Sequence, residues 1–427
     1  MTQGNIVWVL GAGFSKPLGG PLLRDLLGPN SIEEMRSRFP TEIYRSPWAE
    51  GPERLALEAA LWSFGYGTEF RSGHYWPSDG NIERGEALWD DAEDFLDHLD
   101  LAASSPLGSL VPSDWVQGDR AAQLPGVARR RLARILFRFL EKPEVQATLG
   151  DRATRVPSTP HDVILLIKKM NQEARRMMAA QCSAFMYESS DETERWAPFK
   201  KWGASLGPNS TVITFNYDCA AERAAGGNLG VALQPAASPD GKARLYKLHG
   251  STDWVRVQNG GKGCQLTRQE WGGLNLDHAR ICIGTPGPGK REVSSYLQPL
   301  WDEAMKAIRQ AEAIIFVGYR FPPSDSDARE KILDAIQSNE SPRLVLHTVL
   351  GPDVHAESTS RLKGLLLSRL HGREPMKLYA PNDRNEQDRR SGADGKWYAV
   401  LSHPLYSQDF VSATGDPFRV RFPSQLQ

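Results

Sequence analysis

Residues 6–15 read IVWVLGAGFS, and this stretch constrains the fold more than any other part of the 427-residue chain. Five consecutive apolar residues end at Gly11-Ala12-Gly13. Such an uninterrupted run is typical of a strand that is buried on both faces of a parallel sheet. Glycines after the strand let the backbone approach a ligand closely, and amides at the start of the next helix can hold an anion. The stretch therefore predicts either a ligand site at a strand end or a plain strand-to-helix turn.

Comparable apolar runs return only in the second half of the chain, at residues 211–218, 244–251, 280–286, 313–323 and 343–350. Amphipathic helical patterns separate the last three runs, at residues 296–311 and 327–337. Alternation of strands and helices is the pattern of an α/β fold with helices on both faces of a parallel sheet. We therefore predict a Rossmann-like parallel sheet.

The intervening region lacks strand patterns and carries four amphipathic helical ones, at residues 52–65, 87–102, 127–142 and 161–185. A large α-helical insertion is therefore expected to interrupt the sheet. The predicted domains are residues 1–30 plus 205–375 for the Rossmann-like domain and 31–204 for the helical insertion. Residues 376–427 form a C-terminal extension, which begins in a polar stretch and ends with mild β character.

Composition and charge narrow the possible environments and partners. The formal net charge is -1, which gives no general argument for nucleic-acid or membrane binding. The arginines of residues 129–138 surround one apolar helical stripe and are expected to face solvent. The acidic residues of 90–100 surround another stripe and are expected to face solvent or a subunit contact rather than to hold a metal. No apolar run approaches the roughly 18 residues of a membrane-spanning helix, and no signal peptide is apparent. We expect a cytoplasmic protein without direct nucleic-acid binding.

The four cysteines form no Cys-x-x-Cys pair. A zinc knuckle is therefore not expected, and reduced structural thiols are.

Polar residues or glycines follow several of the predicted strands. Asn216 and Asp218 lie at the end of one strand, His249 and Gly250 at the end of another, and Gly318 at the end of a third. Ligands of open α/β sheets bind at the carboxyl ends of the strands. These residues therefore predict one common site.

The order of these motifs resembles the sirtuin family. Residues 11–15, GAGFS, followed by Gly19-Gly20-Pro21 and Arg24, are similar to the sirtuin signature Gly-Ala-Gly-x-Ser-x-x-x-Gly-Ile-Pro-Asp-Phe-Arg at the same spacing. The segments TFNYD at 214–218, LHG at 248–250 and VGYRFPPSD at 317–325 resemble three further sirtuin motifs. The resemblance covers roughly residues 1–30 and 205–350 and implies a sirtuin-type sheet.

Some residues depart from the sirtuin pattern. No four-cysteine zinc module follows His249-Gly250, and Phe215 replaces a glutamine. The motifs as they stand here more closely resemble those of prokaryotic SIR2-like domains, which typically cleave NAD in anti-phage defence. The acidic-apolar stretch DAEDFLDHLD at 91–100 also resembles a helix of such proteins.

The resemblance implies roles for particular side chains. Asn216 would hold the nicotinamide ribose and position the attacking water, and His249 would accept a proton. The implied cofactor-binding residues are Gly11, Ala12, Gly13, Ser15, Arg24, Asp218, Gly318 and Tyr319. Structural interpretations stand beside these: a turn cap for Asn216, a helix N-cap for Asp218 and Asp325, and a solvated helix face for Arg24. The other eight histidines are expected to be structural or exposed.

NAD is thus implied as the substrate, and no metal is expected because its nicotinamide is already a cationic leaving group. The implied function is an NAD⁺ glycohydrolase, the effector of a defence system that depletes NAD⁺. It would be gated by oligomerisation, by a partner ATPase or by a phage-derived activator. The alternatives are an NAD-dependent protein deacylase or ADP-ribosyltransferase, and a non-catalytic assembly subunit that binds NAD or ADP-ribose. The sequence does not separate NAD from NADP or name the trigger.

Overall fold

A computed structural model of the chain describes residues 4–28, 30–38, 52–69, 89, 91–104, 127–143, 145–146, 159–186, 194–234, 241–258, 264–268, 281–283, 291–322, 325–352, 356–375 and 395–413. The chain divides into two compact units. The sheet unit comprises Met1–Gly20, Ser189–Ser251 and Ser294–Gln427, and the helical unit comprises Pro21–Glu188 and Thr252–Val293. The predicted domain boundaries differ from these units and stay a prediction.

The sheet unit is built on an eight-stranded sheet, counted over the described residues, in the order β10-β11-β9-β8-β1-β2-β4-β3. Every strand pair in it is parallel. The predicted α/β fold with a Rossmann-like parallel sheet is therefore confirmed. Its strands are β1 (Ile6–Leu10), β2 (Ser210–Thr214), β3 (Leu229–Val231), β4 (Ala243–Lys247), β8 (Ala313–Val317), β9 (Arg343–Val349), β10 (Glu374–Pro375) and β11 (Trp397–His403).

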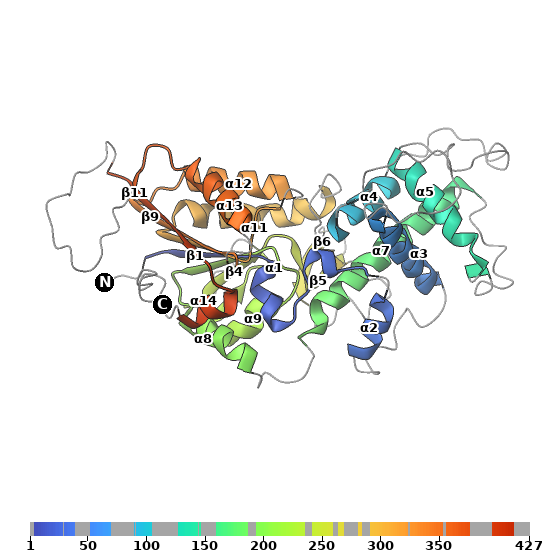
Figure 1. Cartoon of the computed structure of the whole chain (residues 1–427), viewed down its shortest axis with the longest axis horizontal. Coiled ribbons are helices and arrows are strands. Elements are labelled where there is room, and N and C mark those ends of the chain that lie inside the picture. The colour runs from blue at the N-terminus through green and yellow to red at the C-terminus, as the bar shows by residue number, and fades with distance from the viewer. Residues whose placement is uncertain are drawn as a thin grey trace. The chain divides into compact units, whose positions relative to one another are not determined.

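Helices cover both faces of this sheet, as in a doubly wound fold (Figure 1). Helices α11 to α13 lie on one face, and α1, α8, α9 and α14 lie on the other. Their bounds are α1 (Ala12–Ser15), α8 (Ala197–Ser205), α9 (Ala220–Ala225), α11 (Arg291–Arg309), α12 (Ser326–Gln337), α13 (Ala356–Leu367) and α14 (Ser407–Ala413). Short 3-10 helices lie at η1 (Lys16–Leu18), η6 (Glu194–Trp196) and η7 (Gly226–Asn228).

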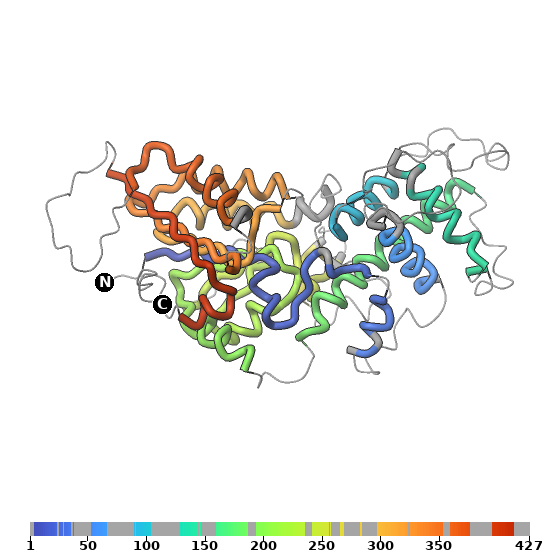
Figure 2. The backbone as a smooth tube through the Cα atoms, viewed as in Figure 1, coloured from blue at the N-terminus to red at the C-terminus, as the bar shows by residue number. Residues whose placement is uncertain are grey.

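Strand β1 occupies the centre of the sheet because each of its five residues is apolar and buried. It pairs with β2 on one side and β8 on the other, so strands far apart in the sequence lie beside it (Figure 2). Trp8 packs edge-to-face against Trp202 of α8, at 5.6 Å between ring centroids, and 6.5 Å from Phe410 of α14. The chain leaves β1 toward β2 and later returns to its other side through β8, which makes β1 the point where the strand order reverses.

Two strands differ from the expected organisation. The run at 280–286 forms β7 (Ile281–Ile283), but this strand belongs to a separate three-stranded sheet of order β6-β5-β7. Its prediction as part of the parallel sheet was wrong because a short apolar run does not reveal its neighbours. Conversely, β11 of the C-terminal extension pairs in parallel with β9 inside the large sheet. The polar stretch that begins this extension lies outside the described residues.

The helical unit packs long amphipathic helices around its own core. They are α2 (Ser31–Arg38), α3 (Pro52–Glu69), α4 (Ala92–Ser104), α5 (Val127–Leu140) and α7 (Pro160–Ala184), with the 3-10 helix η2 (Leu23–Asp25). The unit also contains β6 (Cys264–Arg268), β7 and most of β5 (Gly250–Gln258). The apolar stripes of α4 and α5 are buried as expected, including Leu96, Leu99, Leu132 and Leu136.

Some charged residues of these helices are buried, against expectation. Arg129 is fully buried, and its Nε donates a hydrogen bond to the carbonyl oxygen of Ala102 at 2.8 Å. Glu93 and Asp97 of α4 are also buried within the chain, so the prediction that the acidic residues face solvent or a subunit contact was wrong for both. In the described part of the chain, no helix combines the length and apolarity needed to cross a membrane.

Candidate functional site

The carboxyl ends of four strands meet beside β1 in the sheet unit. The N–H of Gly11 donates to the carbonyl oxygen of Val317 at 3.0 Å, which ties the end of β1 to β8. The N–H of Phe215 donates to Leu10 at 3.1 Å, and that of Leu248 donates to Thr214 at 3.0 Å. The segments after β1, β2, β4 and β8 therefore start from one edge, where ligands of open α/β sheets bind.

The glycines of the first motif pack against backbone from the β8 end. A Cβ atom on Gly11 would lie 2.6 Å from the carbonyl oxygen of Gly318, and one on Gly13 would lie 2.7 Å from its Cα. Gly318 itself has a φ of 67°, in the left-handed region that favours glycine. Close backbone packing and the positive φ of Gly318 thus explain why glycine occupies these positions, without any ligand. Contact of Gly11, Ala12 and Gly13 with a diphosphate stays a prediction.

Asn216 joins the β2 end to the first motif. Its Nδ2 donates to the carbonyl oxygen of Gly11 at 3.0 Å and to Oγ of Ser15 at 3.3 Å. Its backbone N–H donates to Oγ1 of Thr214 at 3.1 Å. The predicted turn-cap and site interpretations therefore both fit its position, because the buried amide holds a turn at the strand edge. Ser15, 1% exposed, is brought to the same place.

Asp218 is buried at the start of α9. Its Oδ1 accepts a hydrogen bond from the N–H of Ala220 at 2.9 Å, and its side chain also hydrogen-bonds with Ser15. Burial raises the pKa of the Asp218 carboxyl, and the charge of Lys247 opposes that rise. The cap interpretation of Asp218 agrees with the contact to Ala220, while the link to Ser15 places the carboxyl among the other candidate residues.

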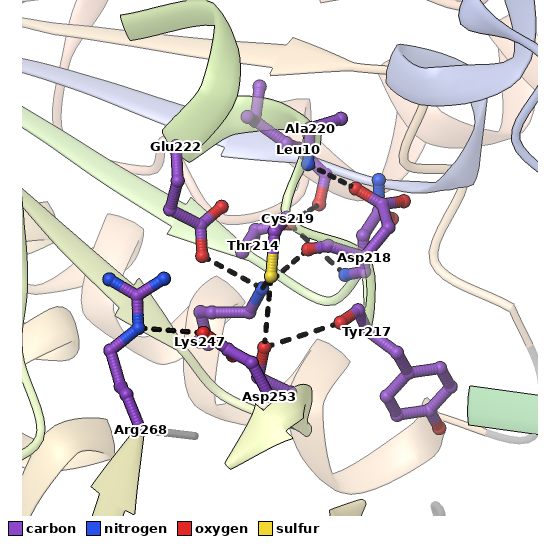
Figure 3. Close-up of polar contacts among 12 residues, drawn as sticks. Leu10, Thr214, Tyr217, Asp218, Cys219, Ala220, Glu222, Lys247, Asp253 and Arg268 are labelled. Carbon is purple, nitrogen blue, oxygen red and sulfur yellow. Dashed lines mark hydrogen bonds and ion pairs between the residues drawn. The ribbon is translucent and has the colours of Figure 1, made fainter. Parts of the chain in front are cut away.

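Lys247, the last residue of β4, is fully buried and was not singled out from the sequence. Figure 3 shows its ammonium reaching toward Glu222, Cys219 and the backbone of Asp218. Its Nζ lies 3.1 Å from Oε1 of Glu222 and donates to the carbonyl oxygen of Asp218 at 2.5 Å. A buried charge needs such partners, and here they fix the turn that carries Asp218. A lysine inside an apolar strand, two residues before His249, was the available signal.

His249 lies among aromatic side chains from the strand ends. Its ring centroid is 5.0 Å from that of Phe215, in an edge-to-face arrangement, and 6.2 Å from that of Tyr217. Phe215 in turn stacks on Tyr319, with centroids 4.2 Å apart and planes 11° from parallel. The next residue, Gly250, has a φ of 80°, which favours glycine and turns the chain away directly after the histidine.

Asp325 is the residue that sequence reasoning placed wrongly. It precedes α12, but its side chain makes no capping hydrogen bond to that helix. Instead, its Oδ1 lies 3.3 Å from Nε2 of His249, and its Oδ2 accepts a hydrogen bond from the Tyr319 hydroxyl at 3.1 Å. Its place after the carboxyl end of β8 was the signal that could have identified it.

Two further predictions are not resolved by this geometry. Arg24 lies in η2 of the helical unit, and its side chain lies outside what the structure describes. No group of three or more His, Cys, Asp or Glu residues in the described ranges is placed to hold a metal ion. The expected absence of a metal stays a prediction.

The comparison with protein families agrees with the position of the site. Residues 210–366, from the start of β2 into α13, match the family described as SIR2-like domain. This span is less than half of the chain and contains Asn216, Asp218, His249, Gly318 and Tyr319. The match supports a SIR2-like relationship for this region and indicates an NAD-related activity. No curated protein matches the chain.

Proposed function

We propose that this protein is an NAD⁺ glycohydrolase, which cleaves NAD⁺ and water into nicotinamide, ADP-ribose and a proton. The observation that supports this most is that the Asn216 amide hydrogen-bonds with both Gly11 and Ser15 at the strand ends. The next residue, Tyr217, places its ring beside that of His249. Both proposed catalytic residues lie within the SIR2-like match.

The residues present suit a nucleotide substrate. The Asn216 amide and the Ser15 hydroxyl are groups that hydrogen-bond ribose hydroxyls, and the Asp218 carboxyl suits the nicotinamide carboxamide. His249 Nε2 is buried and meets the geometry of a hydrogen bond with no group in the described structure, although Asp325 Oδ1 lies 3.3 Å from it. Buried polar groups normally find partners, so this atom favours a site for polar chemistry over a merely structural histidine.

The proposed roles follow from the chemistry of the bond. Cleavage of the nicotinamide–ribose bond develops positive charge on the sugar, as in glycoside hydrolysis. Asn216 orients the ribose and the attacking water, and His249 accepts the proton that the water or a ribose hydroxyl releases. Asn216 and His249 are 9% and 3% exposed, so the site keeps bulk water away from the reaction.

A turnover assay tests this proposal. Purified protein is incubated with NAD⁺ beside Asn216→Ala, His249→Ala and the control His371→Ala, whose histidine is exposed. Nicotinamide and ADP-ribose in equal amounts are expected from the wild type and the control, and not from the other two variants. O-acyl-ADP-ribose formed only with an acyl-lysine peptide would favour a deacylase, and ADP-ribosylated protein would favour a transferase. NAD binding without turnover in any assembly state would favour an assembly subunit, whereas binding without turnover in the isolated protein alone would agree with an enzyme that needs a trigger.

We further propose that the protein is the gated effector of an anti-phage defence system. An ungated enzyme of this kind would deplete the NAD⁺ of its own cell, so activity requires control by oligomerisation, a partner ATPase or a phage-derived activator. Cells that express the wild type or Asn216→Ala are challenged with phage, and NAD⁺ is measured over time. A fall in NAD⁺ on infection, confined to the wild type, is expected. Unchanged NAD⁺ and unchanged phage yield in both strains would count against the defence role.

A further inference from the structure

The His249 imidazole and the Asp325 carboxylate face each other in the interior of the sheet unit. His249 Nε2 lies 3.3 Å from Asp325 Oδ1, and the two residues are 3% and 2% exposed. The residues come from different strand ends, since His249 follows β4 and Asp325 follows β8. A carboxylate buried at this distance acts on the imidazole with little screening by water.

The Asp325 carboxylate is itself held from the opposite side. The Tyr319 hydroxyl donates to Oδ2 at 3.1 Å, which leaves Oδ1 on the side of His249. The Tyr319 ring is in turn fixed by its stack on Phe215 and by Phe321, whose centroid is 5.0 Å away. Tyr319, Asp325 and His249 therefore lie in one line of contacts.

The backbone directly after Tyr319 is held by contacts at Arg320 and Phe321. Phe321 has a φ of 51°, a conformation that non-glycine residues rarely adopt and that persists only where surrounding contacts impose it. Arg361 of α13 supplies such contacts, because its Nη2 donates to the carbonyl oxygens of Arg320 and Phe321 at 2.6 and 3.0 Å. The N–H of Asp325 donates to Pro322 at 3.0 Å.

We propose that Asp325 is a positioning residue for His249, with Tyr319 holding its carboxylate. The carboxylate keeps the imidazole proton on Nε2, and Nδ1 is left with the electron pair that accepts a proton from the substrate or water. A base oriented by a third group is the common arrangement for activating a hydroxyl or water. The role of Nδ1 as the proton acceptor rests on the proposed function. The pairing of His249 with Asp325 does not depend on that function.

The first test reads the histidine tautomer and needs no activity. Nitrogen NMR on the full chain with isotope-labelled histidine reports which ring nitrogen carries the proton, and loss of the signal in His249→Ala assigns it. His249 is expected to be protonated on Nε2 in the wild type and to shift toward the other tautomer in Asp325→Asn. Asp327→Asn is the matched control, because Asp327 lies in the first turn of the same helix and is exposed. A proton on Nδ1 in the wild type, or no change in Asp325→Asn, would overturn the inference.

The second test measures kcat and KM for NAD⁺ cleavage. Asp325→Asn is expected to lower kcat by roughly 10²–10⁴-fold, the usual contribution of a working general base, with little change in KM. Asp325→Glu, which keeps the charge, should recover part of kcat, and Asp327→Asn should match the wild type. Wild-type kcat in Asp325→Asn would overturn the inference. If the wild type cleaves no NAD⁺ in any assembly state, the proposed function fails and the tautomer measurement alone decides. If Asp325→Asn does not fold, Tyr319→Phe takes its place in both measurements, with an expected fall in kcat of only about tenfold.

Discussion

The sheet unit buries histidines in two settings, and the settings differ in what faces the imidazole. His249 lies at a strand end, beside the Asp325 carboxylate. His347 and His403 lie within the neighbouring strands β9 and β11, where their rings stack 5.2 Å apart and Nδ1 of His347 is 3.0 Å from Nε2 of His403. His249 therefore faces a carboxylate, whereas His347 and His403 face each other.

The pKa values of the second pair agree with this difference. Burial lowers the pKa of His347 to about 3, and the neighbouring His403 adds to that effect. Burial lowers the pKa of His403 to about 4. Phe410 of α14 packs beside both rings. The comparison teaches that burial alone does not mark a functional histidine, since its partner and its place relative to the strand ends must also be known.

The largest expected effect separates the two settings by activity. His249→Ala should lower the rate of NAD⁺ cleavage by roughly 10²–10⁴-fold because it removes the proton acceptor. His347→Gln, which keeps an amide able to hydrogen-bond with His403, should leave the rate near that of the wild type. Both are measured well below their melting temperatures. Equal loss in a folded His347→Gln would break the comparison.

Two glycine substitutions compare the tightly packed strand ends with the exposed surface of α13. Gly318→Ala should lower the free energy of unfolding by about 3 kcal/mol, because its Cβ would lie 2.4 Å from the Cα of Gly13 at a φ of 67°. Gly364→Ala, in the exposed part of α13 with open space around it, should raise it by up to about 1 kcal/mol. Chemical unfolding measures both. Similar effects from the two substitutions would contradict the close packing of the strand-end loops.

Acid should destabilise the sheet unit through the histidine pair. The folded-state pKa values lie below the unfolded value of about 6.5, so the unfolded chain binds more protons in the interval. The contribution of the neutral histidine pair to the free energy of unfolding is fully present above pH 6.5 and is lost as the pH falls toward 4. The loss is about 1.4 kcal/mol per pH unit for each proton taken up on unfolding.

Unfolding measured across this pH range tests that expectation. The control is the double variant His347→Leu with His403→Leu, which replaces both partners by apolar groups and should show a shallower loss of stability on acidification. The same slope in the wild type and the double variant would show that the pair does not carry the effect.

The smallest expected effect concerns the hydroxyl behind Asp325. Tyr319→Phe removes the hydrogen bond to Oδ2 and keeps the stack on Phe215, so kcat should fall by about tenfold, near the lower end for loss of one hydrogen bond to a charged group. Steady-state kinetics beside Asp325→Asn measures the ratio. A loss in Tyr319→Phe larger than that in Asp325→Asn would indicate that the hydroxyl acts on the substrate directly.

The sequence predicted the centre of the sheet well because continuous apolar runs such as 6–10 and 313–317 have few alternatives to a buried parallel strand. It also predicted which strand ends carry polar residues, since that follows from position alone. It could not predict that β7 leaves the large sheet or that β11 joins it, because pairing partners are not encoded in a single run.

The site was harder to predict where a residue has two plausible local roles. Asp325 before a helix is a normal N-cap, and only the fold shows that its carboxylate faces His249 instead. Lysine and arginine are usually exposed residue types, and the burial of Lys247 and Arg129 depends on partners distant in sequence. Ser15 and Asn216, 201 residues apart, were linked in advance only through the motif resemblance.

NAD⁺ binding measured by titration calorimetry tests the central claim most directly, because binding at the strand ends does not depend on a trigger. The wild type and His371→Ala should bind NAD⁺ at one saturable site, and Asn216→Ala should bind it much more weakly. No heat of binding in the wild type, or equal affinity in Asn216→Ala, would contradict an NAD site at this edge of the sheet.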